Sequence, residues 1–277
     1  MAPIGRARRA GFAGLLACFI LLNVKCAPAD PVTVRFAQGL VHGFLVLQTL
    51  DGQNIADGEL TQIARGERTT GRLIFHFKDG SLYDETFVFT QRGAFRLLSE
   101  HLIQKGPSFK HPTDLSVNAA TGQVAVRYTD DDGKEKVIND QMKLPPDLAN
   151  GMVPILLANY PANAPQITVS MLAATPKPRL VKLIISPAGE DPFSVGAASH
   201  KATRYVVKID LRGVAGVVAP IIGRQPPDTS VWVFGGDAPV FLKSEGPMFE
   251  DGPIWRIATA SATWPRTESA PSKAGAR

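Results

Sequence analysis

Cysteine is almost absent from this chain of 277 residues. Its only two cysteines, Cys18 and Cys26, both lie near the N-terminus. The chain beyond them therefore has no disulfide, no thiolate nucleophile and no cysteine-based metal site. A domain without disulfides must gain its stability from a hydrophobic core, and roughly 250 residues are ample for one.

After residue 29 the chain also lacks any apolar run of membrane-spanning length. Before that point it has the three parts of an export signal: a basic start, a short apolar core and a small-x-small cleavage pattern. They are Arg6, Arg8 and Arg9, then residues 11–24, then Ala27-Pro28-Ala29. The core is too short to span a bilayer comfortably. We predict a signal peptide over 1–29, cleavage after Ala29, and a periplasmic or secreted protein.

Two alternatives to cleavage remain open at this stage. Cys26 resembles the modified cysteine of the bacterial lipobox, although Lys25 directly before it fits that pattern badly. The apolar core could also stay attached as an uncleaved anchor. We expect membrane contact only through this segment, or weakly at the protein's periphery.

An excess of basic charge is missing once the signal is set aside. The whole chain has 30 Lys and Arg against 25 Asp and Glu, a formal charge of +5. Arg6, Arg8, Arg9 and Lys25 account for four of the positive charges, so residues 30–277 carry 26 minus 25, or +1. Nucleic-acid binders concentrate positive charge to displace counterions. We therefore expect no nucleic-acid partner.

Motifs of catalysis and of cofactor binding are absent as well. His76, His101 and His111 share one predicted strand series, but no HxH or HExxH spacing occurs. The acidic turn 130–133 lacks the calcium-loop pattern and a closing glutamate. We predict no catalytic residue, no metal and no cofactor.

What the chain does have is a succession of short runs rich in β-branched and aromatic residues. Turn dipeptides such as Asp51-Gly52 and Asp79-Gly80 separate them. This spacing is typical of an antiparallel meander, sandwich or barrel. The first predicted series comprises strands at 32–37, 41–50, 57–65, 70–78, 82–91, 94–104, 114–119, 122–129 and 134–139. The second comprises 166–173, 179–186, 192–197, 202–211, 229–235, 239–244 and 253–263.

We predict one β-rich domain over 30–264, built as a large curved antiparallel meander: an open barrel, half-barrel or sandwich with one or two short helices. Its parts are an N-terminal meander (32–143), a helix and linker (145–165) and a C-terminal meander (166–264). The helix is expected at 147–159, capped by Asp147 and kinked by Pro154. The apolar segment 213–222 is either a short helix or a buried crossover. Residues 265–277, which are polar and proline-containing, are expected to be disordered.

Two predicted strand segments, 86–89 and 180–185, are apolar on nearly both faces and need cover on both sides. This layout of export signal, meander, proline-flanked helix and second meander resembles uncharacterised exported envelope β-domains and, loosely, the lipoprotein-carrier half-barrels. That resemblance implies a curved sheet whose covered hollow shelters an acyl chain. It covers about residues 32–264 as a layout, and it assigns no functional residue.

Candidate ligand-contact residues come from two patterns. If the turn after residue 77 has three residues, His76 pairs across the hairpin with Asp84, and a carboxylate beside an imidazole could orient it. Aromatic residues near a loop or near the C-terminus could line an apolar pocket or stack on sugars. The candidates are His76, Tyr83, Asp84, Phe109, Trp232 and Trp255.

The function predicted from sequence is an exported, non-catalytic envelope protein that binds an apolar or amphiphilic ligand, or an envelope partner. One alternative is a glycan-directed hydrolase that uses acidic residues. Asp84 and Glu85 cannot form its carboxylate pair alone, because adjacent strand residues face opposite sides. The other alternative is an assembly protein that docks through a sheet edge.

Overall fold

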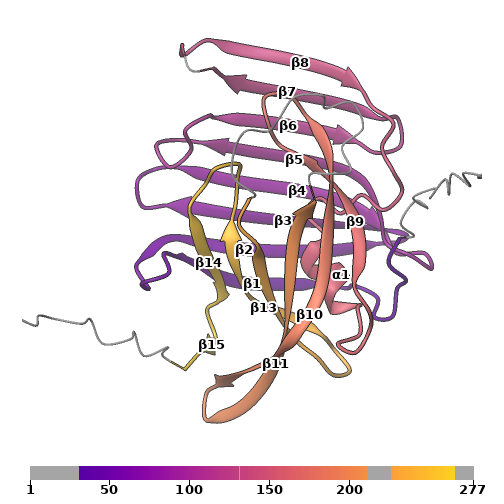
Figure 1. Cartoon of the computed structure of the whole chain (residues 1–277), viewed down its shortest axis with the longest axis vertical. Helices are drawn as coiled ribbons and strands as arrows, with labels where there is room; N and C mark the ends of the chain where they lie inside the picture. The colour runs from indigo at the N-terminus through magenta and orange to yellow at the C-terminus, as the bar shows by residue number, and fades with distance from the viewer. Residues whose placement is uncertain (1–30, 131, 211–225, 266–277) are drawn as a thin grey trace, which may run out of the picture.

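A single antiparallel sheet of 15 strands makes up nearly all of the computed structural model, which describes residues 31–130, 132–210 and 226–265 (Figure 1). Its first half is β1 (Val41–Gln48), β2 (Asn54–Arg65), β3 (Arg68–Phe77), β4 (Leu82–Thr90), β5 (Arg96–Lys105), β6 (Thr113–Asn118), β7 (Gln123–Thr129) and β8 (Glu135–Gln141). Its second half is β9 (Ile167–Ala173), β10 (Arg179–Val195), β11 (Ala198–Asp210), β12 (Thr229–Phe234), β13 (Val240–Pro247), β14 (Ile254–Thr259) and β15 (Ala262–Thr263). The prediction of a mainly β, antiparallel fold is confirmed.

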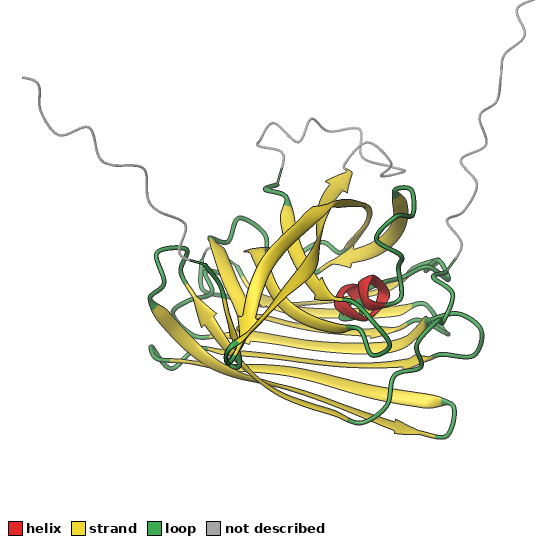
Figure 2. Ribbon diagram, turned by 90° about the horizontal axis from the view of Figure 1, so that it is seen from below, coloured by secondary structure: helices red, strands yellow, loops and turns green. Residues whose placement is uncertain are grey.

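The sheet curves around a hollow without closing into a barrel (Figure 2). The strand order runs β15-β10-β11-β12-β13-β14-β1-β2-β3-β4-β5-β6-β7-β8, and β9 pairs with β10 outside this path. β1 pairs with β14, so the two strand series belong to one sheet. The short helix α1 (Val153–Ala158) lies in the hollow and buries Ile155, Leu156 and Leu157.

Alternation along most strands divides the sheet into a covered concave face and an exposed convex face, whereas β8 has no buried residue. On β4, Tyr83, Glu85, Phe87 and Phe89 are buried, whereas the residues between them are only half-buried. Period-two alternation of this kind is what a strand with one packed face requires. The core is therefore a layer of aromatic and aliphatic side chains beneath α1 and the C-terminal strands.

Two glycines on the concave face lie directly beneath phenylalanine rings of the next strand. Gly58 pairs with Phe75, and Gly71 pairs with Phe87. A Cβ atom on Gly58 would lie 2.2 Å from Phe75 Cε1, and one on Gly71 would lie 2.3 Å from Phe87 Cζ. Only glycine leaves room for these rings to lie across the neighbouring strand, a device that also favours sheet curvature.

Several predicted elements have other bounds. The predicted strands 179–186 and 192–197 form one strand, β10, with an irregularity between Pro187 and Glu190. The predicted strand 253–263 divides into β14 and β15. The predicted strand 32–37 is wrong, since only Thr33 forms a bridge, to Ala94. No ladder forms beyond Thr33, because the backbone N–H groups of Arg35 and Phe36 donate to the side-chain oxygen of Asn159 and not to a neighbouring strand.

The predicted helix at 147–159 is much shorter in the structure. Gly151 has a φ of +66°, which no helical residue adopts, so α1 begins only at Val153 with Pro154 in its first turn. Residues 147–150 instead run beside β9, where Leu148 bridges to Ser170 in parallel. The predicted signal peptide, the segment 213–222 and all but the first residue of the predicted tail lie outside the described residues.

Candidate functional site

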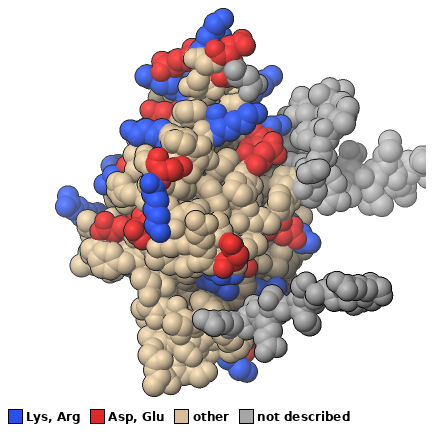
Figure 3. Space-filling model, turned by 90° about the vertical axis from the view of Figure 1, so that its left-hand side faces the viewer, with Lys and Arg blue, Asp and Glu red and all other residues tan. Residues whose placement is uncertain are grey.

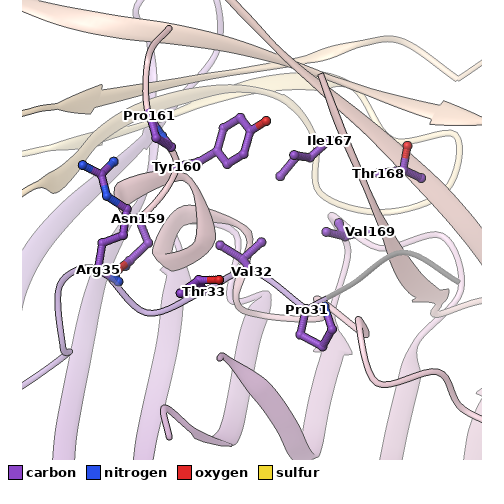
Figure 4. Close-up of a pocket in the computed structure, with 10 residues that line it drawn as sticks. All are labelled: Pro31, Val32, Thr33, Arg35, Asn159, Tyr160, Pro161, Ile167, Thr168 and Val169. Carbon is purple, nitrogen blue, oxygen red and sulfur yellow. Dashed lines mark hydrogen bonds between the residues drawn. The ribbon is translucent and has the colours of Figure 1, made fainter. Parts of the chain in front are cut away.

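A pocket of about 460 Å³ lies where the N-terminal segment, the end of α1 and β9 meet (Figure 4). This volume is within the range of small-ligand sites. The lining residues come from three stretches: Pro31, Val32, Thr33 and Arg35, then Asn159, Tyr160 and Pro161, then Ile167, Thr168 and Val169. Figure 4 shows Tyr160, Ile167, Val32 and Val169 surrounding the central space, with Arg35 at one side.

Asn159, the residue that ends α1, holds the first of these stretches in place. Its Oδ1 accepts hydrogen bonds from the backbone N–H of Arg35 (2.9 Å) and of Phe36 (2.7 Å). Its Nδ2 donates to the carbonyl of Ile155 (3.0 Å). The side chain is buried, so these bonds have no water to replace them. One amide thus fixes the pocket's N-terminal wall to the helix.

Asn159→Ala is expected to lower the free energy of unfolding by about 2 kcal/mol, because it leaves backbone N–H groups of the 31–36 segment without an acceptor. Urea denaturation measures this change. Asn139→Ala, which removes an exposed amide on β8, is the matched control and should change stability by less than about 0.5 kcal/mol. Equal stability of the two variants would contradict the role assigned to Asn159.

The same N-terminal segment is tied on its other side to the turn between β4 and β5. Val34 N–H donates to the Gly93 carbonyl (3.0 Å), and Phe95 N–H donates to the Val32 carbonyl (2.9 Å). The opposite wall is fixed through Tyr205, whose hydroxyl donates to the Tyr160 carbonyl (2.7 Å). The pocket is therefore built from anchored backbone.

The pocket lining is chemically simple. Most of its surface comes from aliphatic and proline side chains and the ring of Tyr160, a phenol whose pKa is raised by burial. Arg35 is its only charged lining residue, and no ion pair of Arg35 occurs among the described residues. Such a lining suits a ligand with an apolar body and one anionic or polar group.

A second notable group is a pair of buried carboxyls on the concave face, Glu85 on β4 and Glu100 on β5. Glu100 is directly opposite Phe87, so Glu85 is its diagonal neighbour on the same face. The two residues are 8% and 4% exposed, and their carboxyls interact electrostatically with each other. Tyr83 also donates its hydroxyl to Glu85 Oε2 (2.9 Å).

Burial raises the pKa of both carboxyls. The shift is larger for Glu100, whose pKa lies well above its ordinary value because the Glu85 charge adds to the desolvation. Glu100 Oε2 has no hydrogen-bond partner in the part of the chain that the structure describes. These properties fit a pair that holds a proton between its members.

This pair does not have the geometry of a glycosidase. The two carboxyls of such enzymes stand about 5 Å or more apart, across a cleft that admits the sugar. Glu85 and Glu100 instead contact each other inside the core. We interpret them as a structural acid pair.

Ser170, Asp147 and Lys182 form a third polar group, beside β9. Lys182 Nζ lies 2.7 Å from Ser170 Oγ and 3.2 Å from Asp147 Oδ2. Ser170 in turn donates to Asp147 Oδ1 (2.9 Å). Ser170 and Asp147 are both buried, so a substrate cannot reach the hydroxyl. The group therefore ties residues 147–150 to the sheet.

The predicted pairing of His76 with Asp84 is wrong. The register places His76 opposite Leu82, and Asp84 opposite Ile74. Asp84 instead accepts two hydrogen bonds from Arg72, at 2.8 and 2.7 Å, and these lower the pKa of the carboxyl. The tighter turn shifts the register by two residues, and both side chains lie on the convex face.

The structure places the other candidate contact residues in three separate parts of the molecule. Phe109 and Trp255 meet in one aromatic cluster, in which each ring contacts both Phe77 and Phe249. Tyr83 is buried beside Glu85. Trp232 belongs to another cluster, where its Nε1 donates to Asp191 (2.6 Å) and Lys243 Nζ lies 3.9 Å from its ring centroid.

None of the six predicted contact residues lines the pocket around Tyr160 and Ile167. Sequence reasoning missed Arg35 and Asn159, because their roles depend on a contact between segments more than 120 positions apart. The buried position of Glu100 could have been predicted, because Glu100, Leu102 and Gln104 alternate along β5 and lie on the same buried face.

No helix of the described residues is long and apolar enough to cross a membrane. The same residues contain no group of three or more His, Cys, Asp or Glu side chains that could hold a metal ion.

Comparisons with known proteins assign no family to the chain. No protein-family model matches it, and no curated protein matches it. Among solved structures it is similar to a β-barrel-like protein of a domain of unknown function, DUF1849, from Brucella abortus. The identity is 9%, over 83% of this chain and 100% of that one, with a TM-score of 0.45. The resemblance to lipoprotein carriers stays a prediction.

Proposed function

We propose that this chain is an exported, non-catalytic binding protein whose pocket takes an amphiphile with a single apolar chain and an anionic head group. The observation that carries this proposal is the pocket's lining, which is mostly apolar and has Arg35 as its one charged residue. The Arg35 guanidinium lies 5.5 Å from the centroid of the Phe36 ring and has no ion pair among the described residues. Burial of a chain against Val32, Ile167 and Val169 would supply the affinity. Arg35 would select the charge of the head group.

A hydrolase has weaker support. Its best observation is the Glu85–Glu100 pair, but these carboxyls are buried in the core, where a substrate has no access to them. The Ser170–Lys182 contact gives no accessible nucleophile either, because Ser170 is buried and donates its hydroxyl to Asp147. Binding is therefore the better proposal.

The test is titration of the delipidated protein with a dansyl-labelled fatty acid, followed by fluorescence. We expect one saturable site. Ile167→Trp should weaken binding at least tenfold, because the side chain of Ile167 points into the central space and the larger indole would fill it. Val137→Trp adds the same indole at an exposed position on β8 and should bind as the parent does. Absence of binding, or equal affinity of Ile167→Trp and the parent, would refute the proposal.

Arg35→Gln tests recognition of the ligand's head group separately from burial of its apolar chain. Loss of the guanidinium should weaken binding of the fatty acid about tenfold, because a charge-assisted hydrogen bond is lost. Binding of the corresponding fatty alcohol, measured by its displacement of the labelled probe, should stay within twofold of the parent. Equal losses for acid and alcohol would assign Arg35 a purely structural role.

A further inference from the structure

Four exposed arginines gather at one end of the sheet, beside the turns that join β2 to β3 and β4 to β5. They are Arg65, Arg68, Arg92 and Arg96, which we call the arginine rim. The register aligns Arg65 with Arg68, Arg68 with Thr90, and Thr90 with Arg96. Three of the arginines therefore belong to one row across four strands, on the convex face.

The protein provides almost no counter-charge for this row. Glu67, at the β2–β3 turn, forms an ion pair with Arg92. No ion pair of Arg65, Arg68 or Arg96 occurs among residues 31–130, 132–210 and 226–265. Like charges directly opposite each other in a sheet are destabilising. With only +1 over residues 30–277, as counted above, the rim is a local concentration of charge.

Large apolar side chains stand exposed on the convex face, and two of them, Leu40 and Ile63, are next to the rim. Leu40, Phe44 and Ile63 are 81%, 66% and 43% exposed. Val41 is opposite Gln62, so Leu40 directly precedes the paired part of β1 beside Ile63. Phe44 lies farther along β1, opposite Glu59. Ile63 lies one row from Arg65 on the same convex face. Apolar and cationic side chains thus occur together at this end.

The opposite end of the molecule differs. Figure 3 looks at the side that lies on the left in Figure 1, where lysine and arginine are interspersed with aspartate and glutamate. The rim is at the other end, near the indigo N-terminal segment on the right of Figure 1. That segment lines the pocket and is bonded to Gly93 and Phe95, between Arg92 and Arg96.

We propose that the arginine rim docks the protein on a membrane surface rich in anionic phospholipid. The guanidinium groups would contact lipid phosphates, and Leu40 and Ile63 would enter the interfacial layer. Unpaired cations beside exposed apolar side chains complement an anionic lipid surface, which offers both phosphate and hydrocarbon. The proposal does not depend on the pocket holding a ligand.

The test is flotation of the full chain with vesicles. One set is phosphatidylcholine alone, and the other replaces one lipid in three by phosphatidylglycerol. We expect binding to the anionic vesicles that salt reverses, since exposed charges are screened. Arg65→Gln with Arg68→Gln should weaken it about 25-fold, or about fivefold for each charge removed.

Lys78→Gln with Lys105→Gln is the matched control, because it removes two exposed positive charges from the other end of the same strands. It should change vesicle affinity less than twofold. Residues 1–30 are present in every variant, so their contribution stays constant. Ile63→Ser should weaken binding to anionic vesicles while leaving its salt dependence unchanged.

Equal losses in the two double variants would show a general charge effect and overturn the proposal. Equal binding to both vesicle types would do the same, as would preference for heparin or an acidic protein over the vesicles. If vesicle binding fails while the dansyl fatty acid still binds, only the docking surface is refuted.

Discussion

A valine in place of Gly71 is expected to lower the free energy of unfolding by about 3 kcal/mol, because the core has no room for it. A Cβ atom there would lie 2.3 Å from Phe87 Cζ. The ring cannot move away, since its other side faces Gly151, where a Cβ atom would lie 2.6 Å from Phe87 Cδ1. Urea denaturation followed by tryptophan fluorescence measures the loss.

Thr70→Val is the natural control for this experiment. Thr70 precedes Gly71 on β3 but is exposed on the convex face. It gives the same final side chain in the same strand, with an expected change of less than about 0.5 kcal/mol. If Gly71→Val were as stable as this control, Phe87 would not be wedged between two glycines.

Glu100→Gln is expected to stabilise the protein by about 1–2 kcal/mol at pH 8 and to flatten its stability against pH. The amide matches glutamic acid in shape and cannot ionise. It removes the cost of charging two buried carboxyls that contact each other, and its NH2 group can still donate to Glu85. Urea denaturation at a series of pH values measures the effect.

The direction follows from the raised pKa of both carboxyls. An ordinary glutamate in the unfolded chain loses its proton near pH 4.5, whereas the folded pair retains protons above that pH. The folded state then binds more protons than the unfolded state, so this pair makes stability fall as the pH rises above about 4.5. At lower pH both states are protonated and the pair contributes no slope.

Glu135→Gln supplies the comparison, because this carboxyl is exposed on β8. It should leave the pH slope unchanged. If Glu100→Gln destabilised the protein at pH 8, the pair would be a charged network that the fold requires, and the interpretation of a shared proton would be wrong.

Local patterns in the sequence predict the strands well and their pairing partners less well. Residues 41–50, 82–91 and 166–173 match β1, β4 and β9 closely, because alternation and turn dipeptides act within a few residues. The hairpin after Phe77 shows the limit. The pairing of His76 with Asp84 needs a turn two residues longer than the one observed, so Asp84 lies opposite Ile74 instead.

The candidate site depends on distant contacts, which explains why the sequence did not reveal it. Arg35 becomes a pocket residue only because the side chain of Asn159 accepts a hydrogen bond from its backbone N–H. In the sequence, Gly151 only weakened the prediction of a longer helix. In the structure it ends the extended segment beside β9 and makes room for the ring of Phe87. Aromatic residues drew attention as ligand contacts, but Phe109 and Trp255 pack against each other's neighbours in the core.

The pairing of β1 with β14 joins two strands from almost opposite ends of the described chain. Most other ladders are hairpins between consecutive strands, which can form as soon as both strands exist. The β1–β14 ladder cannot form until nearly the whole polypeptide is present, and its formation costs the conformational entropy of closing a very long loop. Assembly of the full sheet should therefore end with this seam, and a chain cut short before Ile254 would leave β1 as a bare edge open to intermolecular pairing.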